Sequence, residues 1–228
     1  MAVRNGERFL HDQLASILPQ LAGDDEVIIS DDHSTDGSIR AIEQFHDNRI
    51  TILHNPHSGV ISNFENALRA SRGAYVFLAD QDDVWKPDKV AVMLPNLAHC
   101  DLVVSDCVVV SENLAPIMDS FYQINSSGKG ILRNLMRNSY MGCCMAFHQR
   151  VCTKALPFPP GIPMHDAWIG MIGEICFSVK FLDDKLVMHR RHGANASTNS
   201  VRSRLGLGKR VSHRIRMVKG IIELTYAA

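Results

Sequence analysis

The sequence contains no apolar run that approaches the roughly 18–20 residues of a membrane-spanning helix, and no charged-then-apolar leader opens it. It also lacks an excess of one charge, since 24 Lys and Arg residues balance 24 Asp and Glu residues; this argues against general nucleic-acid binding. The six cysteines include no C-x-x-C pair, so we expect a reduced, cytoplasmic protein. At 228 residues, 46% of them hydrophobic, the chain can bury a core without disulfides or structural metal.

Strand-like and helix-like segments alternate along the first half of the chain. Short apolar runs predict strands at residues 26–32, 49–55, 74–83 and 100–110, and helical spacing lies between them at 34–45, 62–71 and 87–98. Apolar strands that alternate with helices predict an α/β fold, in which a mostly parallel, Rossmann-like sheet is flanked by helices. Ligands of such sheets bind at the carboxyl ends of the strands.

The second half is less regular. We expect a loop over residues 111–130, a strand entering a helix over 140–151, a helix that begins near His165, and two short strands within 176–193. At the other end of the chain, residues 1–4 leave room for only a truncated first strand.

Two acidic clusters follow predicted strands, at Asp31–Asp32 and at Asp80–Asp83, and this placement predicts one shared acidic crevice. Three of the four residues in the second cluster are carboxylates, the ligands that Mg²⁺ and Mn²⁺ prefer when they also bind substrate phosphates. The alternative is an acidic loop that caps the next helix. Asp32 could likewise read a pyrimidine ring or form an Asx turn.

Two later motifs also suggest chemistry. Asp166 in "MHDAWIG" stands at a predicted helix start, where it is either a general base or a simple N-cap. In "MHRRHGANAS", arginines precede a glycine turn, and a diphosphate clamp explains them better than a zinc site does.

In chain order, the motifs are "RNGERFL", "ISDDHSTDGS", "SGVISNFENALRASRGAYVFLADQDDVWKPDKV", "MGCCMAF", "HDAWIG" and "FLDDKLVMHRRHGANAS". Together they resemble the family 2 glycosyltransferases, which have the GT-A fold, and are most similar to the rhamnosyltransferase-like branch that builds bacterial surface polysaccharides. The resemblance runs from Met1 to about Ser197. It implies a glycosyltransferase domain over residues 1–198, with a nucleotide half at about 1–110 and an acceptor half at about 111–198, followed by a basic tail over 199–228.

The resemblance also implies a function and its residues. The expected reaction is inverting, metal-dependent transfer of a sugar from a UDP- or dTDP-linked donor to an acceptor hydroxyl of a saccharide or lipid-linked saccharide. Mg²⁺ or Mn²⁺ is the expected cofactor, with Asp82 as its ligand and Asp166 as the catalytic base. The other matching positions are Ala2, Asp32, Asn63 and Asp80 for the nucleotide, Arg191 and His192 for the diphosphate, and Gly142, Cys143 and His165 for the acceptor side.

One position departs from the family pattern, because Arg4 stands where an aromatic residue is usual, and the first strand is short. Two other classes therefore stay open. The chain could be a non-catalytic or truncated nucleotide-sugar binder. It could also be a phosphohydrolase of the haloacid-dehalogenase type, although in that class the nucleophile strand comes first and here an acidic pair precedes it.

The tail carries seven cations and no acid between Arg202 and Lys219. Val211, Ile215, Val218 and Ile222 form one helical stripe, as in a basic amphipathic helix that lies on an anionic membrane. We therefore expect either a peripheral position on the inner face of the membrane or a stripe that packs on the domain itself.

Overall fold

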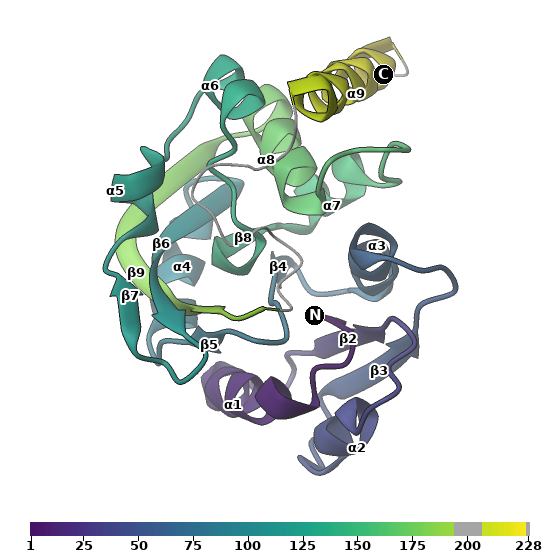
Figure 1. The fold of residues 1–228 in the computed structure, drawn as a ribbon, viewed down its shortest axis with the longest axis vertical. Coiled ribbons are helices and arrows are strands. Elements are labelled where there is room, and N and C mark those ends of the chain that lie inside the picture. The colour runs from purple at the N-terminus through teal and green to yellow at the C-terminus, as the bar shows by residue number, and fades with distance from the viewer. Residues whose placement is uncertain (194–206, 227–228) are drawn as a thin grey trace.

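The computed structural model describes residues 1–193 and 207–226. Three parallel strands form the first sheet, in the order β1 (Ala2–Val3), β2 (Val27–Asp31) and β3 (Ile50–His54). Helices α1 (Glu7–Ile17) and α2 (Ser38–Glu43) lie on one side of it, and α3 (Val60–Ala70) lies on the other (Figure 1). This is the strand–helix alternation that the apolar runs of the first half predict.

The second sheet has the order β4 (Tyr75–Phe77), β8 (Met145–His148), β6 (Leu102–Ser111), β9 (Val179–Arg191) and β5 (Val84–Trp85), and β7 (Pro116–Met118) pairs with β6. Only β6 and β9 run parallel here, whereas the other pairs are antiparallel. The expectation of a mostly parallel sheet is therefore wrong for this half, and the fold is α/β with a mixed sheet. One bridge between Ala2 and Asp80 joins the two sheets.

The remaining helices pack around the second sheet (Figure 1). They are α4 (Lys89–Leu97), α5 (Phe121–Asn125), α6 (Ile131–Met136), α7 (Gln149–Ala155), α8 (His165–Cys176) and α9 (Leu207–Tyr226), with short 3₁₀ turns η1 (Leu18–Gln20) and η2 (Gly142–Cys144). One core cluster runs through both halves, from Leu10 and Ile29 to Trp168 and Met217. No helix among the described residues combines the length and apolar character needed to cross a bilayer.

Two further expectations need correction. Residues 176–193 form one long strand, β9, instead of two short ones, and the segment predicted as a loop after residue 111 contains β7 and α5. The first strand is short, as expected: β1 has two residues beside the five of β2. A cavity of 680 Å³ opens near the start of β2, and its walls include Met1, Ile28 and Tyr75.

Candidate active site

Asp32 follows the carboxyl end of β2 and is buried. Its two oxygens accept hydrogen bonds from Asn55 Nδ2 at 2.9 Å, from the Gly59 backbone N–H at 3.0 Å and from Arg4 Nη1 at 3.1 Å. The Arg4 side chain is 62% exposed, so the guanidinium covers this carboxylate from the solvent side. Arg4, the residue that departs from the family pattern, therefore contacts the carboxylate that is expected to bind the base.

Asn63 and Ala2 lie beside Asp32 at the centre of the first sheet. Asn63 on α3 donates from Nδ2 to the Val3 carbonyl at 3.1 Å, and its buried Oδ1 has no hydrogen-bond partner among the described residues. Ala2 pairs with Ser30 of β2 and bridges to Asp80 on the other side. Strand β1 therefore lies between the two acidic clusters, with Asp31–Asp32 on one side and Asp80–Asp83 on the other.

The acidic cluster after β4 is compact. Burial, reinforced by the charges of Asp83 and Asp82, holds the pKa of Asp80 well above its ordinary value, and burial with the neighbouring Asp83 also raises the pKa of Asp82. Gln81, between them, accepts from the Arg4 backbone N–H at 2.8 Å. Since Arg4 also contacts Asp32, the two acidic motifs lie side by side, as the shared crevice requires.

Asp83 is fully buried and serves a different purpose from its neighbours. Its Oδ1 accepts from His189 Nδ1 and from the Arg190 backbone N–H, both at 2.9 Å. Burial opposes a charged imidazole, yet the Asp83 carboxylate raises the pKa of His189 to about 9. Asp83, Cys143 and His189 bring their ligand atoms within 4.8 Å of one another. The Asp83–His189 pair therefore ties β9 beneath the acidic cluster.

Of the two residues expected to clamp diphosphate, His192 lies against the acidic cluster. Its Nε2 forms a 2.7 Å hydrogen bond with Asp82 Oδ2, and its ring stacks on Phe9 with centroids 4.6 Å apart. Arg191 is the last residue of β9, one position before His192. The structure thus brings His192 to the acidic cluster and places Arg191 at the adjoining end of β9.

Asp166 occupies the first turn of α8, where Met164 and not Asp166 is the N-cap residue. Its Oδ1 accepts from the Ala167 backbone N–H at 2.6 Å and its Oδ2 from the Gly142 backbone N–H at 3.1 Å. Burial raises the pKa of this carboxyl to about 6. The Asp166 charge also contributes to the raised pKa of Asp80, after burial and the two neighbouring aspartates, so the two carboxylates lie within electrostatic reach.

The acceptor-side residues differ in how they surround Asp166. Gly142 must be small, because a Cβ there would lie 3.1 Å from His165 Nε2. His165 is buried and stacks on Phe64 with centroids 3.7 Å apart, and burial lowers its pKa to about 3. The fully buried Cys143 Sγ faces His189 Nδ1 at 3.8 Å, below the site.

Lys89 is a buried residue of the site that the sequence interpretation missed. Its ammonium donates to the Cys143 carbonyl at 2.5 Å and lies 4.0 Å from the centre of the Trp85 ring. It thus holds the η2 turn that presents Gly142 to Asp166. The sequence did carry a signal for it. Lys89, Met93 and Leu97 follow one another at intervals of four, so Lys89 lies on a helix face that is otherwise apolar.

Residues 1–154 match the profile of the family described as glycosyl transferase family 2. The chain belongs to this family. The match sets aside the phosphohydrolase alternative and confirms the family predicted from the motifs.

Two curated relatives illustrate the match. The putative teichuronic acid biosynthesis glycosyltransferase TuaG of Bacillus subtilis is 28% identical over 160 residues, which are 68% of this chain and 62% of the relative. The Escherichia coli UDP-Glc:alpha-D-GlcNAc-diphosphoundecaprenol beta-1,3-glucosyltransferase WfgD is 24% identical over 68% of this chain and 60% of its own length. The chain thus spans about three fifths of these relatives.

A solved structure shows the same fold. The mannosyltransferase PcManGT of Pyrobaculum calidifontis, in complex with GDP-Man and Mn²⁺, superposes with a TM-score of 0.65 at 18% identity. The likeness covers 97% of this chain and 62% of that one. The fold is therefore the GT-A fold.

Proposed function

We propose that this chain transfers a sugar from a nucleotide-diphosphate sugar to an acceptor hydroxyl, with inversion at the anomeric carbon. The observation that carries the proposal is the position of Asp166. This carboxylate, whose pKa burial raises to about 6, lies within electrostatic reach of the Asp80–Asp82 cluster. A proton acceptor beside a site suited to a metal and a diphosphate is the arrangement that glycosyl transfer needs.

The nucleotide end of the site would use Asp32, Asn63, Ala2 and Asp80. Asp32 is the proposed partner of the N3–H group of a pyrimidine, which favours a UDP- or dTDP-linked donor; the donor printed for the relative WfgD is UDP-linked. The donor would compete with the Arg4 guanidinium, which donates to Asp32 Oδ2. The unpartnered Asn63 Oδ1 is available to a ribose hydroxyl or a base N–H.

Asp82 and Asp80 fit a divalent cation. Their pKa values are raised because carboxylates are buried together, and a bound cation relieves the cost of ionising them. Oxygen donors suit Mg²⁺ and Mn²⁺ alike, and PcManGT was solved with Mn²⁺. When bound, such an ion would stabilise the departing diphosphate. Its binding would compete with the hydrogen bond from His192 to Asp82.

The chemistry on the acceptor side belongs to Asp166. With a pKa near 6, this carboxyl is ionised at neutral pH and is a stronger base than an ordinary aspartate, so it can take the proton of the acceptor hydroxyl. The Gly142 backbone N–H and the Lys89–Cys143 contact hold it in place. Arg191 and His192 are the proposed clamp on the diphosphate side.

The curated relatives suggest the setting in which this reaction occurs. Their names place them in teichuronic acid biosynthesis and in glucosyl transfer to a diphosphoundecaprenol-linked sugar. We propose that this chain likewise builds a bacterial surface polysaccharide or glycolipid, with a saccharide or lipid-linked saccharide as acceptor.

Asp82→Ala tests the proposal. Calorimetry with UDP or dTDP is expected to show binding that depends on Mn²⁺ in the native chain and is lost in this variant. Asp88→Ala is the matched control, because Asp88 is an exposed acid between β5 and α4, six residues after Asp82, and its side chain caps no backbone group. Equal nucleotide affinity with Mn²⁺ and with chelator would contradict the metal assignment. Metal-dependent binding with no transfer from any donor would favour the non-catalytic binder.

A further inference from the structure

Helix α9 presents its apolar stripe to solvent instead of to the domain. Val211, Ile215, Val218 and Ile222 are all exposed, Ile215 by 61%. The opposite side of the helix makes the contacts with the domain: Met217 is buried in the core cluster, and Gly220 lies against Trp168 of α8, where an added Cβ would come within 3.0 Å of the ring. The expectation that the stripe packs on the domain is therefore wrong.

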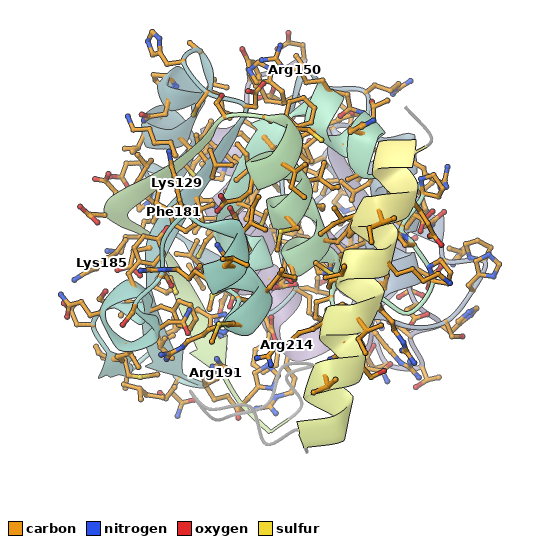
Figure 2. All side chains as sticks on the ribbon, turned by 90° about the horizontal axis from the view of Figure 1, so that it is seen from above. Lys129, Arg150, Phe181, Lys185, Arg191 and Arg214 are labelled. Carbon is orange, nitrogen blue, oxygen red and sulfur yellow. The ribbon has the colours of Figure 1, made fainter. Side chains whose placement is uncertain are left out.

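A second apolar surface continues the stripe. Helix α6 lies beside α9 and exposes Ile131, Met136 and Leu132, the last by 77% (Figures 1 and 2). Arg214 of α9 joins the helices, because its guanidinium donates to the Leu135 and Met136 carbonyls, both at 3.0 Å. The exposed apolar residues of both helices define what we call the α6–α9 face: Ile131, Leu132, Met136, Val211, Ile215, Val218 and Ile222.

The α6–α9 face lies in segments that contain cations and no acid. Residues 120–165 include no Asp or Glu, and neither do residues 207–222. Over the same stretches the sequence carries Lys129, Arg133, Arg137, Arg150, Lys154, Lys209, Arg210, Arg214, Arg216 and Lys219. Arg133, Arg137, Arg216 and Lys219 are exposed close to the apolar residues. Two acids border the face, because Glu223 pairs with Lys219 on α9 and Glu174 accepts from the Gly130 N–H at the start of α6. The cations outnumber these acids, so the region around the face carries a net positive charge.

We propose that the α6–α9 face binds the surface of an anionic lipid bilayer, with both helices lying in the interface. An anionic bilayer binds exposed apolar side chains that are flanked by cations. The apolar side chains contact the acyl chains, and the cations contact the anionic headgroups. A second copy of the chain fits less well. A symmetric dimer places the same patch on both subunits, so the cations would face one another.

Membrane binding through the α6–α9 face would also affect the proposed function, and this part of the inference rests on that function. Trp168, one of the residues that α9 contacts, lies on α8, the helix that also carries Asp166. A bilayer bound to the α6–α9 face would therefore lie on the side of the domain that α8 faces. An acceptor sugar carried on a lipid would then reach the site from the membrane.

Vesicle co-sedimentation with the full chain tests the inference. The native chain is expected to pellet at low salt with phosphatidylcholine vesicles that contain phosphatidylglycerol, and to stay in solution with pure phosphatidylcholine or at high salt. The paired change Leu132→Ser and Ile215→Ser should weaken binding by about tenfold or more, because two exposed apolar side chains that the bilayer would bury are lost. Ile117→Ser is the control, since Ile117 is 55% exposed on β7 and lies outside the face.

Two outcomes overturn the inference. The first is no sedimentation with anionic vesicles, or the same loss of binding in the Ile117→Ser control. The second is a dimer in vesicle-free solution that the paired change dissociates, which would make a second copy the occupant of the face. Nucleotide binding is measured separately, so vesicle binding without donor binding would leave this inference standing while the proposed function fails.

Discussion

Asp166 is a buried carboxylate whose pKa of about 6 lies above the ordinary 3.8. The folded chain therefore holds a proton there that the unfolded chain releases between these two values. The stability that this proton confers is complete below pH 3.8 and is lost as the pH rises through 6. At neutral pH the ionised group costs the fold about 3 kcal/mol, which is the energetic consequence of burying the proposed base.

Asp166→Asn separates a role as base from a purely structural role. We expect the variant to keep nucleotide affinity and to lose transfer by roughly 10²–10⁴-fold, because Asn cannot accept the proton. It should also be more stable than the native chain near pH 7, and the difference should shrink toward pH 4. Turnover and denaturant unfolding at several pH values measure both effects. Near-native turnover would contradict the role of base and leave Asp166 as an acceptor for the Gly142 and Ala167 N–H groups.

At the residue scale, the sequence revealed groups that end predicted strands, such as Asp32 and Asp80. Strand ends in α/β folds meet at one edge, so spacing is enough to place them together. It did not reveal the His189–Asp83 contact, which pairs residues that are 106 positions apart. Such a contact depends on how β9 lies against β5, which no local pattern encodes.

Helix α8 fits against the site because Gly170 leaves room for an aromatic ring. A Cβ on Gly170 would lie 2.2 Å from the Tyr140 ring. Tyr140 in turn donates from its hydroxyl to Glu174 Oε1 at 2.8 Å and comes two residues before Gly142. The closeness of α8 and Tyr140 therefore helps to bring the Gly142 N–H to Asp166.

Two glycine-to-alanine changes test this packing. Gly170→Ala is expected to destabilise the fold by about 1–3 kcal/mol through overpacking, and to lower transfer as η2 shifts. Gly208→Ala in α9 has nothing within 4 Å of the new Cβ, so it should stabilise the helix by about 0.5–1 kcal/mol. Thermal and denaturant unfolding compare the two variants. A destabilisation of equal size in both would show that the Tyr140 contact is not responsible.

At the element scale, strand β9 shows why boundaries were harder to predict than element types. The sequence predicted two short strands within residues 176–193, a stretch that contains the polar pair Asp183 and Asp184. In the structure β9 continues through them with a shift of register, since Leu182 pairs with Ser105 while Lys185 pairs with Asp106. The polar pair therefore marks a bulge in one strand. Similarly, the spacing of Val211 and Ile215 predicts an amphipathic helix but not which face contacts the domain.

On the scale of the whole molecule, the two sheets meet at β1. Within residues 1–193, β1 pairs with β2 through Ala2–Ser30 and Val3–Asp31, and Ala2 also forms a bridge to Asp80. The Met1 backbone nitrogen donates to the Ile28 carbonyl at 2.7 Å, which continues the pairing of β1 with β2 by one residue. The junction of the sheets thus rests on few backbone pairs.

The two-residue β1 also has a dynamic consequence. Asp32 stands on one side of this strand and Asp80 on the other, so a local opening of β1 would separate the proposed base-binding carboxylate from the proposed diphosphate-binding cluster without unfolding either sheet. A donor that contacts both sides would hold β1 closed and slow amide hydrogen exchange at Ser30 and Asp32, whose N–H groups donate to Met1 and Val3. A strand of two residues would then determine how tightly the proposed nucleotide site holds together.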